Sequence, residues 1–323
     1  MRHVNPLAKI FVYVCAVVLI AALLAPPVYW IAQALGERDV LPALAAFPFF
    51  RFFSRIAQIT ALVLLWPLIR SLRIGGMREL GIERNPNFRR DLLAGLGLAL
   101  LGMGASSVMA LLPLVALAIG YFAFEIYKPR DEWKVFGFLR VIGTAAVVGT
   151  VEEFLFRGVL LGLAIRYIGR LPGLLVISFV FSIVHFIKPR GMIEDVHWWS
   201  GFELLGTAFA SPDGPGVLLA GATALFVIGW ILGAVTMRTR SLALAIGLHA
   251  GWVLGQQTIN LLGKYRVKPP DALLPWVGPN VVSGMVPTGV VPMTALLVTG
   301  ALVWWYLACG RTAPAPTADR SAG

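Results

Sequence analysis

The strongest constraint on the fold of this chain is a series of apolar runs. Each run is long enough to cross a lipid bilayer as a helix, which takes about 20 residues. Hydrophobic residues make up 58% of the chain, charged residues make up 13%, and the mean hydropathy is +0.81. A soluble protein normally carries about 25% charged residues. We therefore predict an all-α polytopic membrane bundle of about eight transmembrane helices, the fifth of them short, near residues 10–35, 54–70, 91–121, 137–165, 172–187, 217–237, 241–262 and 287–309.

Basic residues predict the orientation of this bundle. The net charge is +11, and cytoplasmic loops of membrane proteins are enriched in Lys and Arg. The basic residues are scattered between apolar segments rather than gathered on one soluble module, so we predict no nucleic-acid partner. An N-in, C-in topology places the most basic loops in the cytoplasm, namely those carrying Arg70, Arg73, Arg78, Arg84, Arg89 and Arg90, then Arg166 and Arg170, and then Arg238 and Arg240.

Composition also suggests subdivisions of the chain. Pro26 and Pro27 are expected to kink the first helix or end it early. The stretch "LPALAAFPFFRFF" at 41–53 is interrupted by Pro and Arg, and we expect it to lie at the membrane interface. We divide the chain into residues 1–136 with the first three helices, 137–262 with helices four to seven, 263–310 with the last loop and helix eight, and a disordered tail at 311–323.

Very few ionisable residues fall inside the predicted spans. Of the sixteen acidic residues, only Glu152 and Glu153 lie deep within a span, and Arg157 follows them in "EEFLFR". Of the four histidines, His185 and His249 lie within the fifth and seventh spans. A charge at the centre of a membrane helix costs about 2.5–3.5 kcal/mol on insertion scales, so such residues mark function by default.

Depth along the helices places three of these side chains at similar levels. From the cytoplasmic ends of their predicted helices, Glu152, His185 and His249 lie about 21, 20 and 12 Å into the membrane, at about 1.5 Å per residue. We therefore predict that helices four, five and seven bring a carboxylate and two imidazoles together near mid-membrane.

The two glutamates differ in their helical neighbours. Glu153 and Arg157 are four residues apart and share a helix face, so they can form an ion pair. Glu152 projects about 100° away from Glu153. We hypothesise that Arg157 neutralises or orients Glu153 and leaves Glu152 for chemistry. A single buried histidine or one such ion pair is often purely structural, and it is their joint occurrence that indicates a site.

These motifs, in this order, resemble the CAAX protease and bacteriocin-processing family of intramembrane proteases, also called the Abi or type II CAAX prenyl endopeptidase family. The EExxxR motif of the family matches "EEFLFR", which contains Glu152, Glu153 and Arg157. Its FxxxH motif matches "FSIVH", which contains Phe181 and His185. The resemblance covers about residues 137–262 and agrees with the eight-helix layout.

The third motif of the family is matched only in part. It has a histidine four residues before an Asn or a variable residue, and "HAGWV" matches it at His249. Val253 stands where the eukaryotic prenyl proteases have Asn, and Val253 cannot donate a hydrogen bond to a developing oxyanion. Gln256 and Gln257 lie one helical turn further on and are candidates to replace that donor.

The resemblance implies a hydrolytic site. In the family, the first-motif glutamate is thought to activate a water, and the two histidines hold that water, a metal ion or the oxyanion. Carried over to this chain, Glu152 is the general base, Glu153 belongs to the same catalytic set, and His185 and His249 orient or ligate. Glu152, His185 and His249 also form a plausible three-ligand zinc set with an open water position. A metal-free, Glu-activated water remains the alternative.

The sequence lacks the motifs of the other classes of intramembrane protease. The chain contains no HExxH zinc helix, no aspartate deep within a predicted span, and no GxSG followed by a histidine. A transporter with a proton relay would also need buried titratable groups, but we find no internal inverted repeat.

We therefore predict an intramembrane endopeptidase acting on a membrane-anchored or lipidated peptide in the lipid bilayer. The short loops and the Arg-rich cytoplasmic side suggest a bacterial inner (plasma) membrane. The alternative is a non-catalytic family member that acts as a membrane scaffold or as a bacteriocin self-immunity protein.

Overall fold

The computed structural model describes residues 6–109, 127–129, 135–186, 193, 195–207, 215–265 and 290–309. The predicted tail at 311–323, and the part of the third predicted helix beyond Met109, lie outside the described residues. Each of the eight predicted apolar segments contains a helix. The helices are α1 (Pro6–Glu37), α2 (Pro42–Ala45), α3 (Phe49–Ser71), η1 (Met77–Leu80), α4 (Phe88–Met109), α6 (Val135–Glu153), η2 (Phe154–Leu160), α7 (Leu161–Ile168), α8 (Arg170–Phe186), α9 (Ser200–Thr207), α10 (Pro215–Thr239), α11 (Ala243–Leu262) and α13 (Val290–Ala308).

The predicted helical class is confirmed, and the number of membrane spans stays a prediction. Three helices among the described residues are long and apolar enough, by length and composition, to cross a membrane: Ala8–Glu37, Phe49–Ser71 and Leu219–Thr239. The N-in, C-in orientation also stays a prediction. One short strand pair accompanies the helices, because β1 (Tyr127–Pro129) runs antiparallel to β2 (Gly263–Tyr265) with Tyr127 opposite Tyr265.

The helices form two compact units. The smaller unit comprises Met1–Gly76 and Ile183–Pro212, and the larger unit comprises Met77–Ser182 and Asp213–Gly323. The end of α8 therefore belongs to the smaller unit, while the rest of that helix belongs to the larger one.

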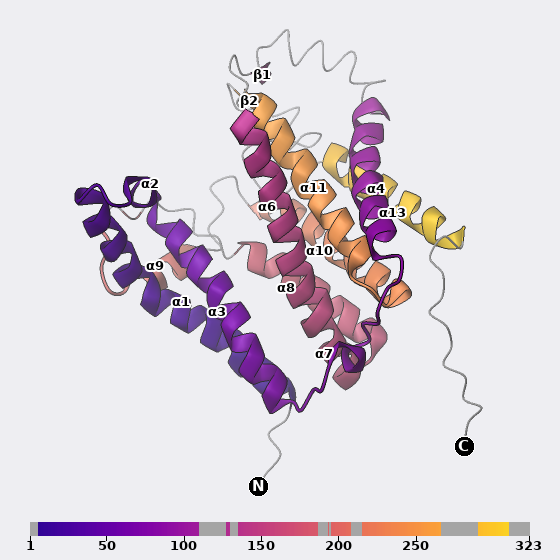
Figure 1. Cartoon of the computed structure of the whole chain (residues 1–323), viewed down its shortest axis with the longest axis horizontal. Coiled ribbons are helices and arrows are strands. Elements are labelled where there is room, and N and C mark those ends of the chain that lie inside the picture. The colour runs from indigo at the N-terminus through magenta and orange to yellow at the C-terminus, as the bar shows by residue number, and fades with distance from the viewer. Residues whose placement is uncertain are drawn as a thin grey trace. The chain divides into compact units, whose positions relative to one another are not determined.

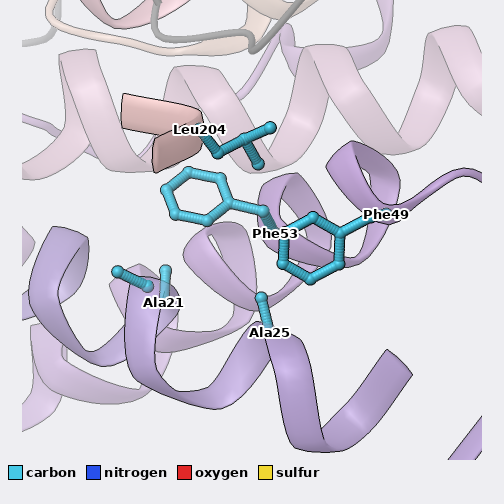
Figure 2. Close-up of a cluster of buried hydrophobic side chains, with 6 residues drawn as sticks. Ala21, Ala25, Phe49, Phe53 and Leu204 are labelled. Atoms are coloured by element: carbon cyan, nitrogen blue, oxygen red, sulfur yellow. The ribbon is translucent and has the colours of Figure 1, made fainter. Parts of the chain in front are cut away.

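The core of the smaller unit forms where α1, α3 and α9 meet. Phe49 and Phe53 of α3 pack with Leu204 of α9 against the small residues of α1, as Figure 2 shows for Ala21 and Ala25. These alanines, with Ala22, leave room for the two aromatic rings, and every member of the cluster is at most 3% exposed. The last five residues of the stretch at 41–53 begin α3, and three of them, Phe49, Phe52 and Phe53, are buried. The interfacial position of the stretch stays a prediction.

Helix α1 is longer than the sequence suggested. We expected Pro26 and Pro27 to kink the helix or end it early, but α1 continues through both residues to Glu37. Pro26 is fully buried against the rest of the smaller unit. Packing of an apolar face supplies most helix stability in proteins and compensates for the hydrogen bonds that prolines remove.

In the larger unit, α11 lies beside both α4 and α6 (Figure 1). Glycines allow the close approach: a Cβ on Gly95 of α4 would collide with the carbonyl oxygen of Leu244, and a Cβ on Gly247 of α11 would collide with that of Leu92. On the other side, a Cβ on Gly149 of α6 would lie 3.1 Å from the backbone nitrogen of Ala250. Small residues at membrane-helix interfaces let backbones approach in this way. The position of α11 is therefore fixed by two neighbours.

A buried carboxylate joins three elements at one end of the larger unit. Asp91, in the first turn of α4, is 3% exposed. Its Oδ2 accepts a hydrogen bond from Asn85 Nδ2 at 2.9 Å, and its Oδ1 accepts bonds from Arg90 Nη2 at 3.0 Å and from the Tyr306 hydroxyl of α13 at 3.3 Å. Asn85 also donates to Ser241 Oγ at 3.1 Å, just before α11. This set of residues, which we call the Asp91 network, ties the start of α4 to α11 and α13.

Candidate active site

Glu153 is the centre of a buried polar cluster in the larger unit. Its side chain is fully buried, and its Oε1 accepts a hydrogen bond from Arg157 Nη1 at 2.8 Å. The ion pair predicted from the four-residue spacing is therefore present. The same Oε1 lies 2.8 Å from Nδ1 of His249 on α11. One carboxylate oxygen thus connects the first predicted motif with the third.

This contact determines how His249 presents its ring. A carboxylate paired with an arginine only accepts hydrogen bonds, so the proton between Glu153 and His249 is on Nδ1. In the neutral imidazole, Nε2 is then the acceptor. A carboxylate that holds one ring nitrogen fixes both the tautomer and the ring orientation, as is common for histidines at functional sites.

Glu152 lies on the other side of the His249 ring. Its Oε2 is 3.9 Å from His249 Nε2, and its side chain is 16% exposed. That separation is too long for a direct hydrogen bond. It is a distance that a single bridging water can span. Glu153 is therefore hydrogen-bonded to one nitrogen of the imidazole, and Glu152 lies near the other.

Arg157 is held by more than its carboxylate partner. It is 1% exposed, and its Nη2 lies 3.4 Å from the carbonyl oxygen of Gly229 on α10. Its guanidinium carbon lies 4.2 Å from the centre of the Phe181 ring. A cation over an aromatic face is stabilised by the ring quadrupole, and more so when it is desolvated. This geometry accounts for an arginine that is almost completely buried.

Phe181 brings the second motif to the same place. Its ring meets the His249 ring edge to face at 6.1 Å between centres, and it meets the Phe156 ring in the same way at 5.2 Å. Phe181 is thus packed between the arginine of the first motif and the histidine of the third. The sequence predicted only that Phe181 belongs to the motif, whereas the structure gives it these contacts.

His185, four residues after Phe181 on α8, shares a helix face with it. His185 is half-buried, and it belongs to the smaller unit, whereas the Glu153 cluster belongs to the larger one. The meeting of His185 with Glu152 and His249 therefore stays a prediction.

The remaining candidates lie on α11 beyond His249. Val253 is half-buried, and so are Gln256 and Gln257. The role of the two glutamines in supporting an oxyanion stays a prediction.

A π-helical segment, η2, carries Arg157. The two glutamates are the last residues of α6, and η2 begins at Phe154; the backbone N–H of Leu161 bonds to the carbonyl of Phe156, five residues earlier. Short π-helical turns occur frequently at functional sites. We had assumed regular α-helix throughout, and no feature of the sequence signals the wider turn.

The zinc set predicted from the sequence, Glu152, His185 and His249, stays a prediction. No group of three His, Cys, Asp or Glu side chains among the described residues could hold a metal ion. The third predicted ligand, His185, belongs to the other unit.

Comparison with known protein families agrees with the resemblance noted in the sequence. Residues 134–255 match the family described as type II CAAX prenyl endopeptidase Rce1-like. The match contains all three motifs, from Glu152 to His249, and it places this segment in a family of membrane proteases. Comparisons with curated proteins and with solved structures give no match.

Proposed function

Because residues 134–255 carry an Rce1-like domain, we propose that the chain is an intramembrane endopeptidase that cleaves a membrane-anchored or lipidated substrate. One observation supports this function above the others. The two nitrogens of His249 face two different carboxylates, with Nδ1 on Glu153 at 2.8 Å and Nε2 3.9 Å from Glu152. A structural histidine needs only the first of these contacts.

In the proposed reaction, Glu152 acts as the general base toward the water held between its Oε2 and His249 Nε2. The water oxygen attacks the carbonyl carbon of the scissile peptide bond while Glu152 takes its proton, and the electron pair of the C=O bond moves onto the oxygen. The tetrahedral intermediate then collapses, the C–N bond breaks, and protonated Glu152 gives its proton to the leaving amine. Base catalysis of this kind contributes about 10²–10⁴-fold.

Glu153 and Arg157 serve this reaction by positioning His249. Glu153 fixes the Nδ1–H tautomer, and Arg157 pairs with the buried carboxylate at 2.8 Å and holds it in place. His185 enters the proposal through the second motif, as a further group that orients the water or the substrate carbonyl. No step of this scheme passes through a metal, and Gln256 and Gln257 remain candidates for oxyanion support.

The substrate proposal rests on where the domain lies. Apolar helices and the matched family indicate an integral membrane protein, so a substrate must reach the site from the bilayer or its surface. A lipid-anchored or transmembrane peptide satisfies this condition. We place the protein in a bacterial inner (plasma) membrane because of its short loops and Arg-rich cytoplasmic side.

One departure favours the alternative, a non-catalytic family member acting as a scaffold or as a bacteriocin self-immunity protein. Val253 replaces an oxyanion-supporting Asn, and removing one such donor costs other hydrolases about 10²–10³ in rate. A scaffold would tolerate loss of Glu152, whereas a protease would not.

The test is a comparison of peptide termini in membrane fractions from cells expressing the wild type, Glu152→Gln or Glu37→Gln. Glu37 is exposed at the end of α1 and serves as the control. We expect new termini with the wild type and Glu37→Gln, and their loss by at least 100-fold with Glu152→Gln. Identical termini in all three would reject the protease and favour the scaffold.

Zinc is tested separately on the purified protein. The metal-free scheme predicts turnover unchanged after exhaustive chelation. Loss of turnover that returns on adding Zn²⁺ alone would instead support the three-ligand set of Glu152, His185 and His249.

A further inference from the structure

Buried polar atoms without a partner gather around His249. The Nε1–H of Trp252 and the Oε2 of Glu153 are both buried, and neither makes a hydrogen bond to the described residues. Leaving such a group unpaired costs about 1–3 kcal/mol, so each orphan in a native structure needs an explanation. Glu153 contacts His249 directly, and Trp252 follows His249 by three residues on α11.

The helical geometry of α11 directs Trp252 to the side of His249. Residues three apart lie about 60° from each other around a helix and one turn apart along it. Side chains of helices lean toward the N-terminus, and from this geometry we infer that the indole of Trp252 lies over the turn that carries His249. The face of α11 that contacts α4 is a different one, formed by Gly247 and Gly251, where a Cβ would collide with Leu92 and Ala99.

Trp252 is also unusual because the polar N–H of its indole ring is buried. Only 8% of the residue is exposed, and an indole N–H is a hydrogen-bond donor that cannot accept. Buried tryptophans usually find a partner for this group. A donor with no acceptor in the described protein is available to an acceptor that arrives with a substrate.

The chemistry of the proposed reaction requires such a donor. The peptide oxygen becomes negative when water attacks, and Val253, next to Trp252, cannot donate to it. We propose that the Trp252 indole N–H is a catalytic hydrogen-bond donor that stabilises this oxyanion in place of the missing Asn. The inference rests on the proposed protease function and adds to it a residue at a variable position of the third motif, between His249 and Val253.

The kinetic test compares Trp252→Phe with Trp230→Phe, using a quenched fluorescent peptide that spans the cleavage site found in the membrane fractions. Trp230 is a half-buried tryptophan of α10 in the same unit and serves as the control. We expect kcat to fall about 100-fold in Trp252→Phe with KM nearly unchanged, because the donor acts on the transition state. Trp230→Phe should keep the wild-type kcat.

A second replacement at position 252 distinguishes loss of the hydrogen bond from a packing defect. Benzothienylalanine at position 252 keeps the bicyclic shape and replaces the N–H with sulfur. The same loss of kcat in this variant, with an unchanged melting temperature, would assign the effect to the hydrogen bond. Wild-type kcat in this variant would overturn the proposal.

An NMR measurement of ligand binding detects the hydrogen bond of the Trp252 indole N–H directly. In protein labelled with ¹⁵N at the indole nitrogens, the Trp252 signal is identified by its loss in Trp252→Phe. A phosphonate analogue of the cleaved peptide, which mimics the tetrahedral oxyanion, should move this indole proton downfield and leave that of Trp230 in place. An unmoved Trp252 signal with the analogue bound would overturn the proposal.

The two proposals fail in different ways. Undiminished turnover by Trp252→Phe, together with inactive Glu152→Gln, would remove the role of Trp252 and keep the protease. Absence of cleavage by the wild type would remove both.

Discussion

Among the described residues of the larger unit, two carboxylates are buried, Asp91 and Glu153, and their hydrogen bonds are arranged in opposite ways. Both oxygens of Asp91 accept hydrogen bonds, from Asn85 on one side and from Arg90 and Tyr306 on the other. Both described contacts of Glu153 fall on Oε1, from Arg157 and His249, while Oε2 has no partner among the described residues.

This difference separates a structural role from a functional one. A saturated carboxylate holds its neighbours in place and has no capacity left for a ligand. A buried carboxylate oxygen without a hydrogen bond destabilises the folded state, so its presence in a native structure indicates a functional role or compensation by other interactions. We therefore interpret the Asp91 network as a structural joint and the Glu153 cluster as the candidate site.

The largest expected effect comes from breaking the ion pair of the site. Arg157→Met leaves the Glu153 charge buried without a cation, which typically costs about 3–5 kcal/mol. Thermal unfolding in detergent should show this loss, and the double variant Arg157→Met with Glu153→Gln should recover part of it because no uncompensated charge remains. A loss below about 1 kcal/mol in the single variant would contradict the role of the pair.

The next effect distinguishes the two carboxylates by activity. Glu153→Gln removes the charged acceptor that holds His249 Nδ1, and orienting groups of this kind are worth about 10–100-fold in activity. Asp91→Asn should lower stability by about 1.5–3 kcal/mol, because hydrogen bonds to a charged group are lost or weakened. Its turnover per folded molecule should stay at the wild-type value. Equal losses of turnover in the two variants would remove the distinction.

The smallest expected effect comes from removing one hydrogen bond of the Asp91 network. Tyr306→Phe removes the 3.3 Å hydrogen bond to Asp91 Oδ1, and we expect it to cost about 0.5–1.5 kcal/mol of unfolding free energy. Tyr13→Phe is the matched control, since Tyr13 donates to the uncharged carbonyl of Ala61 at 2.8 Å in the smaller unit. A Tyr306 variant more stable than the wild type would show that Asp91 does not need this donor.

Much of the fold was predictable because the length of an apolar run indicates whether it can form a membrane-spanning helix. A run of about 20 residues predicts a helix wherever it occurs, and all eight runs contain one. The pairing of Glu153 with Arg157 was predictable for a similar local reason, the repeat of the helix.

The interhelical part of the site was not predictable from one sequence. The helix repeat assigned Glu153 to Arg157, but it carried no information on which carboxylate His249 would contact from another helix. The π-helical turn and the contacts of Phe181 depend on packing between elements in the same way. Likewise, Pro26 and Pro27 indicated a helix end that burial of α1 overrode, because tertiary packing outweighs local propensity.

The glycine contacts of α11 also bear on the route by which a substrate enters. Along Gly95, Gly247 and Gly251 the backbones of α4 and α11 approach so closely that even a methyl group would collide. A lipid tail or a peptide could pass between α4 and α11 only if the two helices separated. In the proposed protease, a substrate would therefore reach His249 from a side of α11 other than the one packed against α4.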